Sequence, residues 1–193
     1  MRDMRFVAVT AAVVLLTSGA VRAEEKAAAA PRPASEMAQM KVFESKWSCT
    51  GSVNASPSGP AHRTVATVYG HRDLGDFWVS GRYHESKTPE SPVPLEGMFH
   101  MTWDPGAKQF VMLWLDNTGG WAQETSPGWV GDTIVLTGEG WFGGQKLGER
   151  DTFTRKGTAE LAHTYDLNMN GQWTQFGQET CTPAATATGA AKH

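Results

Sequence analysis

The sequence has few cysteines and no excess of positive charge, and each shortage excludes a class of protein. Among 193 residues there are two cysteines, too few for a small disulfide-rich scaffold, and they form no CxxC pair for a structural zinc site. Lysine and arginine number 17 against 20 acidic residues, which gives a net charge of −3. Nucleic acid and anionic membranes select strongly basic surfaces, so we expect neither as the main partner.

Catalytic and cofactor-binding signatures are also missing. The sequence contains no GxSxG nucleophile motif, no HExxH zinc motif and no Walker loop. Its six histidines include no pair two or four residues apart, so a zinc site would need ligands from several strands. A GxGxxG pattern begins at Gly138, but no helical periodicity follows it, and we interpret its glycines as a β-turn or bulge. We predict no metal and no cofactor, and the sequence favours a non-enzymatic function without excluding an activity.

The N-terminus resembles a secretory signal peptide. Residues 1–23 join a basic start to an apolar run, with the small residues Val21 and Ala23 at positions −3 and −1 of a cleavage site. A retained membrane anchor is the alternative, although the apolar run is shorter than the roughly 20 residues of a spanning helix. We predict cleavage after Ala23, a periplasmic or secreted location, and no membrane span in the mature chain.

Short β-prone runs separated by turn residues extend over residues 36–182. The clearest pattern is Gly97 to Trp121, where turn formers at residues 104–108 join two apolar runs and residues 116–120 end the second. This arrangement predicts three antiparallel strands. Similar runs recur about every ten residues, which predicts an all-β, antiparallel barrel of about ten strands.

A short helix and two unstructured segments complete the predicted organisation. Apolar residues recur at three- and four-residue spacing from Met37 to Phe43, and Ser35 can cap a helix there. Residues 24–35 contain little to bury, so they are predicted to be a flexible leader. Residues 183–193 are predicted to be a disordered tail.

The two cysteines, Cys49 and Cys181, lie near the start and the end of the predicted domain. In an oxidising compartment an even pair most simply forms one disulfide, and two buried free thiols are the alternative. Closing the barrel makes its first and last strands neighbours, and these strands carry the two cysteines. Disulfide formation and barrel closure are therefore linked predictions.

Several short motifs resemble those of the DUF1579 family of uncharacterised proteins, over roughly residues 37–182. After the predicted helix, the matching segments are KWSCTG at residues 46–51, LGDFW at 74–78, TWDP at 102–105 and WLDNTG at 114–119. Two departures are Thr102-Trp103 in place of the family's usual Gly-Tyr and Ser45-Lys46 in place of Gly-Thr. The resemblance implies a lipocalin-like barrel and no established activity.

One face of the predicted sheet mixes large apolar side chains with a few polar ones, as a small-molecule cavity requires. We assign Trp78 and Trp114 to its walls, together with Met112, and Arg82 or His100 as a polar anchor. The leading hypothesis is that the barrel binds a small apolar or amphipathic ligand.

A solid barrel that serves as an interaction module remains the alternative. Val111, Leu113 and Leu115 form an aliphatic stripe on the opposite face of their strand. We expect this stripe to be covered by the helix, by a partner or by a second copy in a homodimer.

Titratable residues offer a third possibility, an enzyme with its site at the barrel mouth. Such a site would require His84, His100 and Glu124 to lie together. Glu149 and Asp151 could act as a general acid and base, but we interpret them as part of a solvated strand face beside neighbouring arginines.

Overall fold

The structure is a computed structural model, and it describes residues 30–55 and 60–184. The predicted signal peptide, with its cleavage site, and residues 185–193 of the predicted tail lie outside these residues. Contacts within the chain define one compact unit from Arg32 onwards, which is the unit described below. In the described residues, no helix is both long and apolar enough to cross a membrane.

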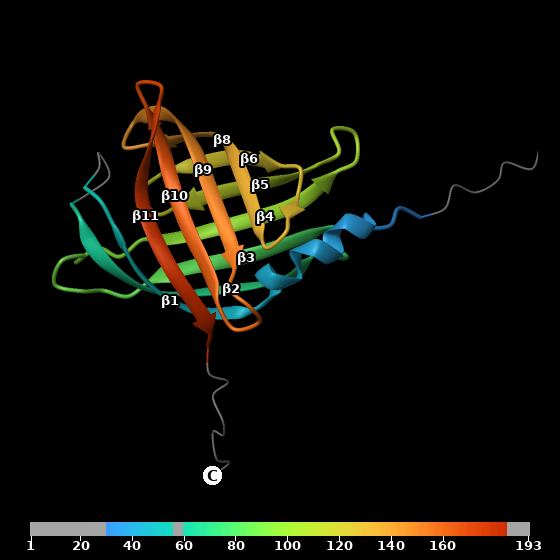
Figure 1. Ribbon diagram of the computed structural model, residues 1–193, viewed down its shortest axis with the longest axis horizontal. Helices are drawn as coiled ribbons and strands as arrows, with labels where there is room; N and C mark the ends of the chain where they lie inside the picture. The colour runs from blue at the N-terminus through green and yellow to red at the C-terminus, as the bar shows by residue number, and fades with distance from the viewer. Residues whose placement is uncertain (1–29, 56–59, 185–193) are drawn as a thin grey trace, which may run out of the picture. The chain divides into compact units, whose positions relative to one another are not determined.

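In these residues, ten antiparallel strands close into a barrel, as predicted, and a short helix and a two-residue strand accompany them (Figure 1). Their order around the barrel is β6-β5-β4-β3-β2-β1-β11-β10-β9-β8, and pairing of β6 with β8 closes it. β7 pairs only with β8. The elements are η1 (Ser35–Glu44), β1 (Lys46–Val53), β2 (His62–Asp73), β3 (Trp78–Glu85), β4 (Glu96–Asp104), β5 (Gln109–Asp116), β6 (Trp121–Ser126), β7 (Trp129–Val130), β8 (Thr133–Phe142), β9 (Gln145–Arg155), β10 (Leu161–Met169) and β11 (Gln172–Pro183).

Turn chemistry sets the strand ends. Between β4 and β5, the Asp104 side chain accepts hydrogen bonds from the backbone amides of Gly106 and Ala107, which holds the turn. Between β8 and β9, Gly143 and Gly144 have positive φ angles of 55° and 80°. Glycine adopts this left-handed conformation at little cost. The GxGxxG segment is therefore part of a β-hairpin, as predicted.

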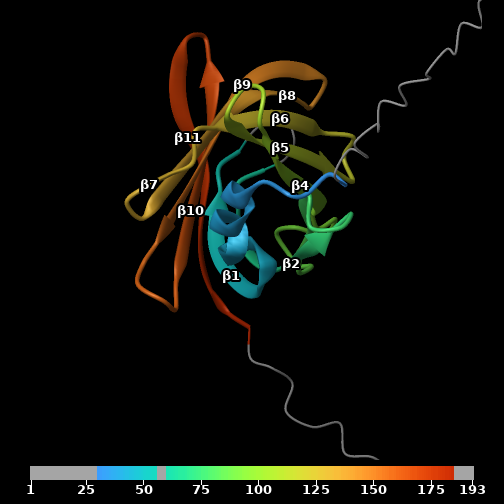
Figure 2. The same cartoon turned by 90° about the vertical axis from the view of Figure 1, so that its right-hand side faces the viewer.

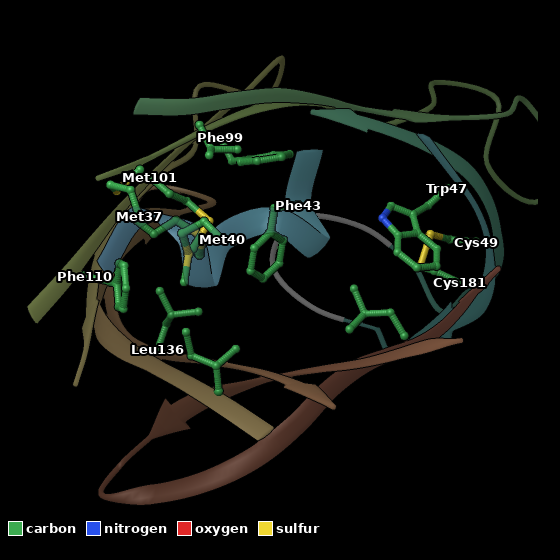
Figure 3. Packing of buried hydrophobic residues seen from close by; sticks show 14 of the residues in the cluster. Met37, Met40, Phe43, Trp47, Cys49, Phe99, Met101, Phe110, Leu136 and Cys181 are labelled. Carbon is green, nitrogen blue, oxygen red and sulfur yellow. A yellow bond between two sulfur atoms is a disulfide. The ribbon is translucent and has the colours of Figure 1, made fainter. Parts of the chain in front are cut away.

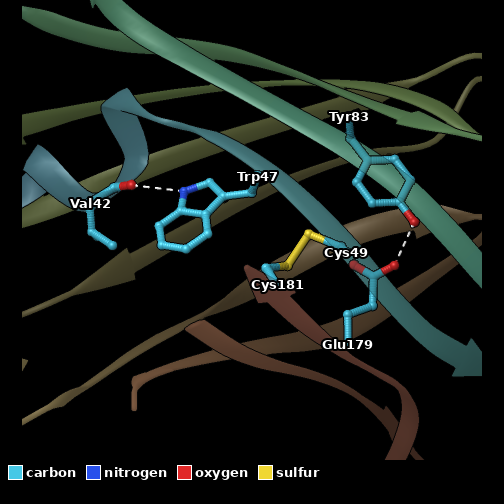
Figure 4. Close-up of a disulfide and its surroundings, with 6 residues drawn as sticks. All are labelled: Val42, Trp47, Cys49, Tyr83, Glu179 and Cys181. Atoms are coloured by element: carbon cyan, nitrogen blue, oxygen red, sulfur yellow. Dashed lines mark hydrogen bonds between the residues drawn. A yellow bond between two sulfur atoms is a disulfide. The ribbon is translucent and has the colours of Figure 1, made fainter. Parts of the chain in front are cut away.

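The first and last strands are joined covalently. β1 pairs with β11 with Cys49 opposite Cys181, and the two residues form a disulfide with Cα atoms 4.0 Å apart (Figure 4). The pairing continues to Pro183, so β11 extends into the segment predicted as tail. The amide of Ala184 also donates to the Lys46 carbonyl. Both the disulfide and the closing strand pair are confirmed.

The helix η1 fills one end of the barrel, and Figure 2 faces this end with η1 in front of the strands. It is a 3₁₀ helix, in which residues three apart lie on the same side, and its buried residues Met37, Met40 and Phe43 follow that spacing (Figure 3). Arg72 on β2 holds the helix by donating to the Met37 carbonyl and to Glu44. The predicted Ser35 cap is wrong, because Ala34 is at the N-cap and no side chain bonds there.

Candidate ligand-binding cavity

The barrel interior is packed at the helix end and hollow toward the other. At the helix end, buried apolar side chains from η1 and from most strands form a continuous core (Figure 3). Toward the other end lies a cavity of about 220 Å³. Its apolar lining comprises Val53, Pro60, Tyr83, Val93, Leu95, Trp114, Phe142, Leu147, Tyr165, Leu167 and Phe176. A smaller cavity of about 90 Å³ adjoins it and shares Tyr83 and Trp114 with it.

Two of the five predicted ligand-binding residues line these cavities. Trp114 lines both, and Met112 lines the smaller one. Trp78, Arg82 and His100 line neither cavity. The predicted face of β5 is therefore the inner one, while the predicted faces of β3 and β4 are the outer ones.

The inner faces of β3 and β4 were assigned wrongly because, inside the barrel, a small residue on one strand makes room for a large side chain on the next. On β3 the inner residues include Gly81 and Tyr83, and the partner of Gly81 on β4 is Phe99. A Cβ atom at Gly81 would overlap the Phe99 ring, so the glycine provides the space that the ring fills. The large Trp78 side chain, which was predicted to lie in the cavity wall, is on the outer face instead.

A second glycine makes space for the indole in the cavity wall. A Cβ atom at Gly97 would overlap the Trp114 ring. The Trp114 indole is held in place because its Nε1 donates to Asp116 Oδ2 at 3.2 Å. Asp116 Oδ1 in turn accepts from the amides of Thr118 and Gly120, so this carboxylate is used to build the corner between β5 and β6.

The enzyme site imagined from the sequence is not assembled. His84 on β3 lies beside Glu96 in an exposed pair, with 3.4 Å between Nδ1 and Oε1. His100 pairs with the Ser80 hydroxyl at 2.9 Å, on the outer face of the same two strands. Glu124 is only 1% exposed, and His84 and His100 are directed away from the interior.

Acidic side chains in the interior are the main feature that the sequence did not predict. Glu149 and Asp151 are buried and line the cavity, so the prediction of a solvated strand face is wrong. They lie between Leu147 and Phe153 on the inner face of β9, and this shared parity is the signal that could have identified them. Among the described residues, five carboxylates line the cavity: Glu85, Asp116, Glu149, Asp151 and Glu179.

Several of these carboxylates are paired with neighbouring side chains. Glu85 lies 2.9 Å from His62 Nε2 and also accepts from the Leu95 amide. Asp151 lies 2.7 Å from His163 Nε2.

The carboxylate of Glu179 is held beside the disulfide. Tyr83 donates its hydroxyl to Glu179 at 2.8 Å, next to Cys49 and Cys181 (Figure 4). Burial and the negative charge of Glu179 together raise the pKa of Tyr83 well above its ordinary value. Tyr83 therefore stays protonated and remains a hydrogen-bond donor at neutral pH.

Glu149 and Glu124 differ from the paired groups because they are protonated at neutral pH. Burial, followed by the charges of Asp151 and Asp116, raises the pKa of Glu149 to about 9. Burial and the charges of Asp151 and Glu149 raise the pKa of Glu124 to about 11. Within the described residues, Oε2 of each and Oγ1 of Thr64 have no hydrogen-bond partner. Thr64 and Glu149 line the cavity, so they can hydrogen-bond a ligand.

The interior geometry does not favour a metal ion. In the described part of the chain, one group of three potential ligands has its donor atoms within 4.8 Å of one another: Cys49, Cys181 and Glu179. The two sulfurs are bonded to each other, so neither is a thiolate that could hold a metal.

These features define a class of protein, a closed antiparallel barrel with an internal cavity that is apolar over most of its surface and acidic at a few points. Residues 32–182 match the family described as protein of unknown function DUF1579, and the chain belongs to this family. The resemblance noted in the sequence is thus confirmed.

The fold has a counterpart among solved structures. The crystal structure of Rv2717c from M. tuberculosis is similar with a TM-score of 0.60, covering 80% of this chain and 100% of that one. The two sequences are 12% identical, so the similarity concerns the fold alone. No curated protein sequence matches this chain significantly.

Proposed function

We propose that the protein binds a small apolar or amphipathic ligand inside the barrel. The observation that carries the proposal is the cavity of about 220 Å³, with its predominantly apolar and aromatic lining. Sites for small molecules commonly combine such walls with a few polar groups. An apolar cavity of about 150 Å³ is enough to hold benzene, so a ring with a short side chain is a suitable size here.

We also propose that the protein works outside the cytoplasm, in the periplasm or as a secreted protein. The disulfide between Cys49 and Cys181 supports this location, since disulfides persist mainly in oxidising compartments. Detection of a mature N-terminus at Glu24 by mass spectrometry would test the predicted cleavage. Full-length protein retained in the cytoplasm would contradict it.

Tryptophan fluorescence can test ligand binding, because Trp114 lies in the cavity wall. Short-chain alcohols, fatty acids, amines and small aromatic compounds are titrated into the folded protein, and binding is expected to shift or quench the emission. Leu147→Phe adds volume to the cavity lining and is expected to weaken binding roughly tenfold or more. The matched control, Val135→Phe, lies outside the cavity on β8, where Val135 is 39% exposed, and should leave affinity unchanged. No binding by any compound, or equal affinity in both variants, would contradict the proposal.

A second candidate function is self-association or partner binding through the outer face. Leu115, Trp121 and Trp141 are register partners on β5, β6 and β8, and each is more than 40% exposed. They extend the aliphatic stripe predicted on β5. The helix η1 does not cover this stripe at Leu115, which remains exposed. A contiguous apolar row of this kind is typical of interaction sites.

Light scattering distinguishes this candidate from a monomeric binding protein. If the row forms a homodimer, the wild-type protein should show twice the monomer mass at high concentration, and Trp121→Ser should restore the monomer. Trp173→Ser, at an exposed tryptophan on β11, serves as the control. A wild-type monomer at all concentrations would remove the homodimer.

A further inference from the structure

Glu149 is the acidic group in the cavity whose hydrogen-bonding capacity the fold leaves unused. It is 9% exposed, it lines the cavity, and its Oε2 has no partner within the described residues. The Oγ1 of Thr64, on β2 and separated from β9 by three strands around the barrel, is also buried, unpartnered and part of the lining. Burying a polar group without a hydrogen bond costs free energy, so both atoms are positioned to gain from a ligand.

The charge around the cavity favours a positive ligand group. Among the described residues that line it, none is a lysine or arginine, while five are acidic and two are histidines. Each histidine is already beside a carboxylate, His62 beside Glu85 and His163 beside Asp151. The charged groups that act on Glu149 are both negative: Asp151 on its own strand and Asp116 on β5.

We propose that the ligand is a small amphipathic amine whose protonated nitrogen donates to Glu149 and whose apolar body lies against the aromatic and aliphatic wall. This inference deepens the proposed function and rests on it. An ammonium group supplies up to three donors and a positive charge, and hydrogen bonds between charged groups are stronger than neutral ones. The wall beside it, formed by Trp114, Leu147 and Leu167, provides the apolar contact.

A single cationic group fits this site better than a metal ion. The other acidic groups have partners: Asp116 accepts backbone amides at the β5–β6 corner, and Glu179 accepts from Tyr83. No three carboxylate or imidazole groups of the cavity lining, in the part of the chain described, bring their ligand atoms within 4.8 Å of one another. Metal sites need several such ligands, whereas an amine needs one strong acceptor.

The test compares three probes that share a phenyl ring and a short chain: 2-phenylethylamine, 2-phenylethanol and 3-phenylpropionate. Binding to the full chain is measured by calorimetry and tryptophan fluorescence near pH 7. We expect the amine to bind roughly tenfold or more tightly than the alcohol, and the carboxylate to bind weakest. Equal or tighter binding of the alcohol, or preference for the carboxylate, would overturn the amine assignment while leaving the proposed binding function intact. Binding of none of the three probes would count against both proposals.

Variants locate the interaction. Glu149→Gln keeps the shape of the side chain but cannot ionise to meet an ammonium group, so the preference for amine over alcohol should fall to less than about threefold. Glu139→Gln is the matched control, since Glu139 is an exposed carboxylate on β8 beside Lys146, and it should keep the preference. A preference that survives in Glu149→Gln would overturn the role of Glu149.

Proton release provides a measurement on the wild-type chain that does not depend on any variant. An ammonium ligand requires the ionised form of Glu149, whose pKa is raised by burial and by Asp151, so binding near pH 7 should release about one proton. Calorimetry in two buffers of different ionisation enthalpy measures this number. Release of no proton, or uptake of one, would contradict the proposal.

Discussion

Glu124 and Glu149 show how strongly position controls the chemistry of one residue type inside this barrel. Glu85 is as deeply buried as Glu124, yet Glu85 has His62 and a backbone amide as partners. Glu124 receives one long hydrogen bond of 3.3 Å from the Asp151 amide and has the negative charge of Asp151 nearby. Glu124 and Glu149 therefore retain their protons, because among the described residues too few hydrogen bonds and no positive charge stabilise the ionised carboxylate against burial.

The raised pKa values predict an unusual dependence of stability on pH. Between about pH 5 and pH 9, the folded protein keeps protons on Glu124 and Glu149 that the unfolded chain releases, so the free energy of unfolding falls as the pH rises. Glu149→Gln should flatten this slope and raise the free energy of unfolding at pH 8 by about 1–3 kcal/mol, with a much smaller effect near pH 5. Urea denaturation at several pH values in this range measures the free energy of unfolding of the wild type and the variant.

The exposed Glu139→Gln variant is the control for this experiment, and it should follow the wild type at each pH. A wild-type protein whose stability increases steadily from pH 5 to pH 9 would contradict the protonated state of both glutamates.

At the residue scale, the sequence predicted the cysteine pair but not the acidic interior. Cys49 and Cys181 are the only two cysteines, so one pairing was possible within the chain. Glu149 and Asp151 carry charge, and charged residues are rarely buried without partners, which made a solvated face the reasonable interpretation. The parity shared with Leu147 and Phe153 indicated otherwise, but Arg150, which lies between the two acidic residues in the sequence, obscured it.

At the scale of elements, η1 closes one end of the barrel and is held there by residues of two strands, β2 and β9. Arg72 on β2 donates to the Met37 carbonyl at 2.6 Å. From the opposite direction, Arg155 on β9 donates to the Gln39 carbonyl and stacks on Trp129, 3.5 Å from the ring centroid. Polar contacts therefore fix the position of the helix, while its apolar side chains fill the core.

Truncating the central residue of this helix should be costly. Met40 is fully buried, so Met40→Ala is expected to lower the free energy of unfolding by about 2–5 kcal/mol through lost burial and the cavity it leaves. Chemical denaturation measures the change. Met169→Ala, at a residue 44% exposed on β10, should cost less than about 1 kcal/mol. Similar losses in the two variants would mean that η1 does not contribute to the core.

The strands were predictable because their turns are strongly marked. The three strands around residues 97–121, which are β4, β5 and β6, were predicted from their turn residues. What local pattern could not supply was the inner face of β3 and β4. That choice depends on Gly81 lying under Phe99, a contact between strands that a single-strand periodicity does not contain.

At the scale of the whole molecule, the disulfide is a covalent link across the seam, that is, the pairing of the first strand β1 with the last strand β11. It joins residues 132 positions apart, so in the chain-entropy description it removes about 4–5 kcal/mol of freedom from the unfolded state. Cys181→Ala is therefore expected to lower the free energy of unfolding by about 2–5 kcal/mol. Reduction of the wild-type protein should produce a loss of similar size, and an unchanged denaturation midpoint in both cases would contradict this role.

The same seam sets an order of events for a growing chain. β2 and β3, or β4 and β5, can pair as soon as each hairpin is complete, because their partners are adjacent in sequence. The edge of β1 has to wait for β11, whose Cys181 is made 132 residues after Cys49. Until then the sheet has open edges, which are templates for pairing with other chains, and Cys49 is a thiol without its partner. In a protein with this architecture, the open sheet edge and the unpaired thiol therefore persist until the last strand has been added.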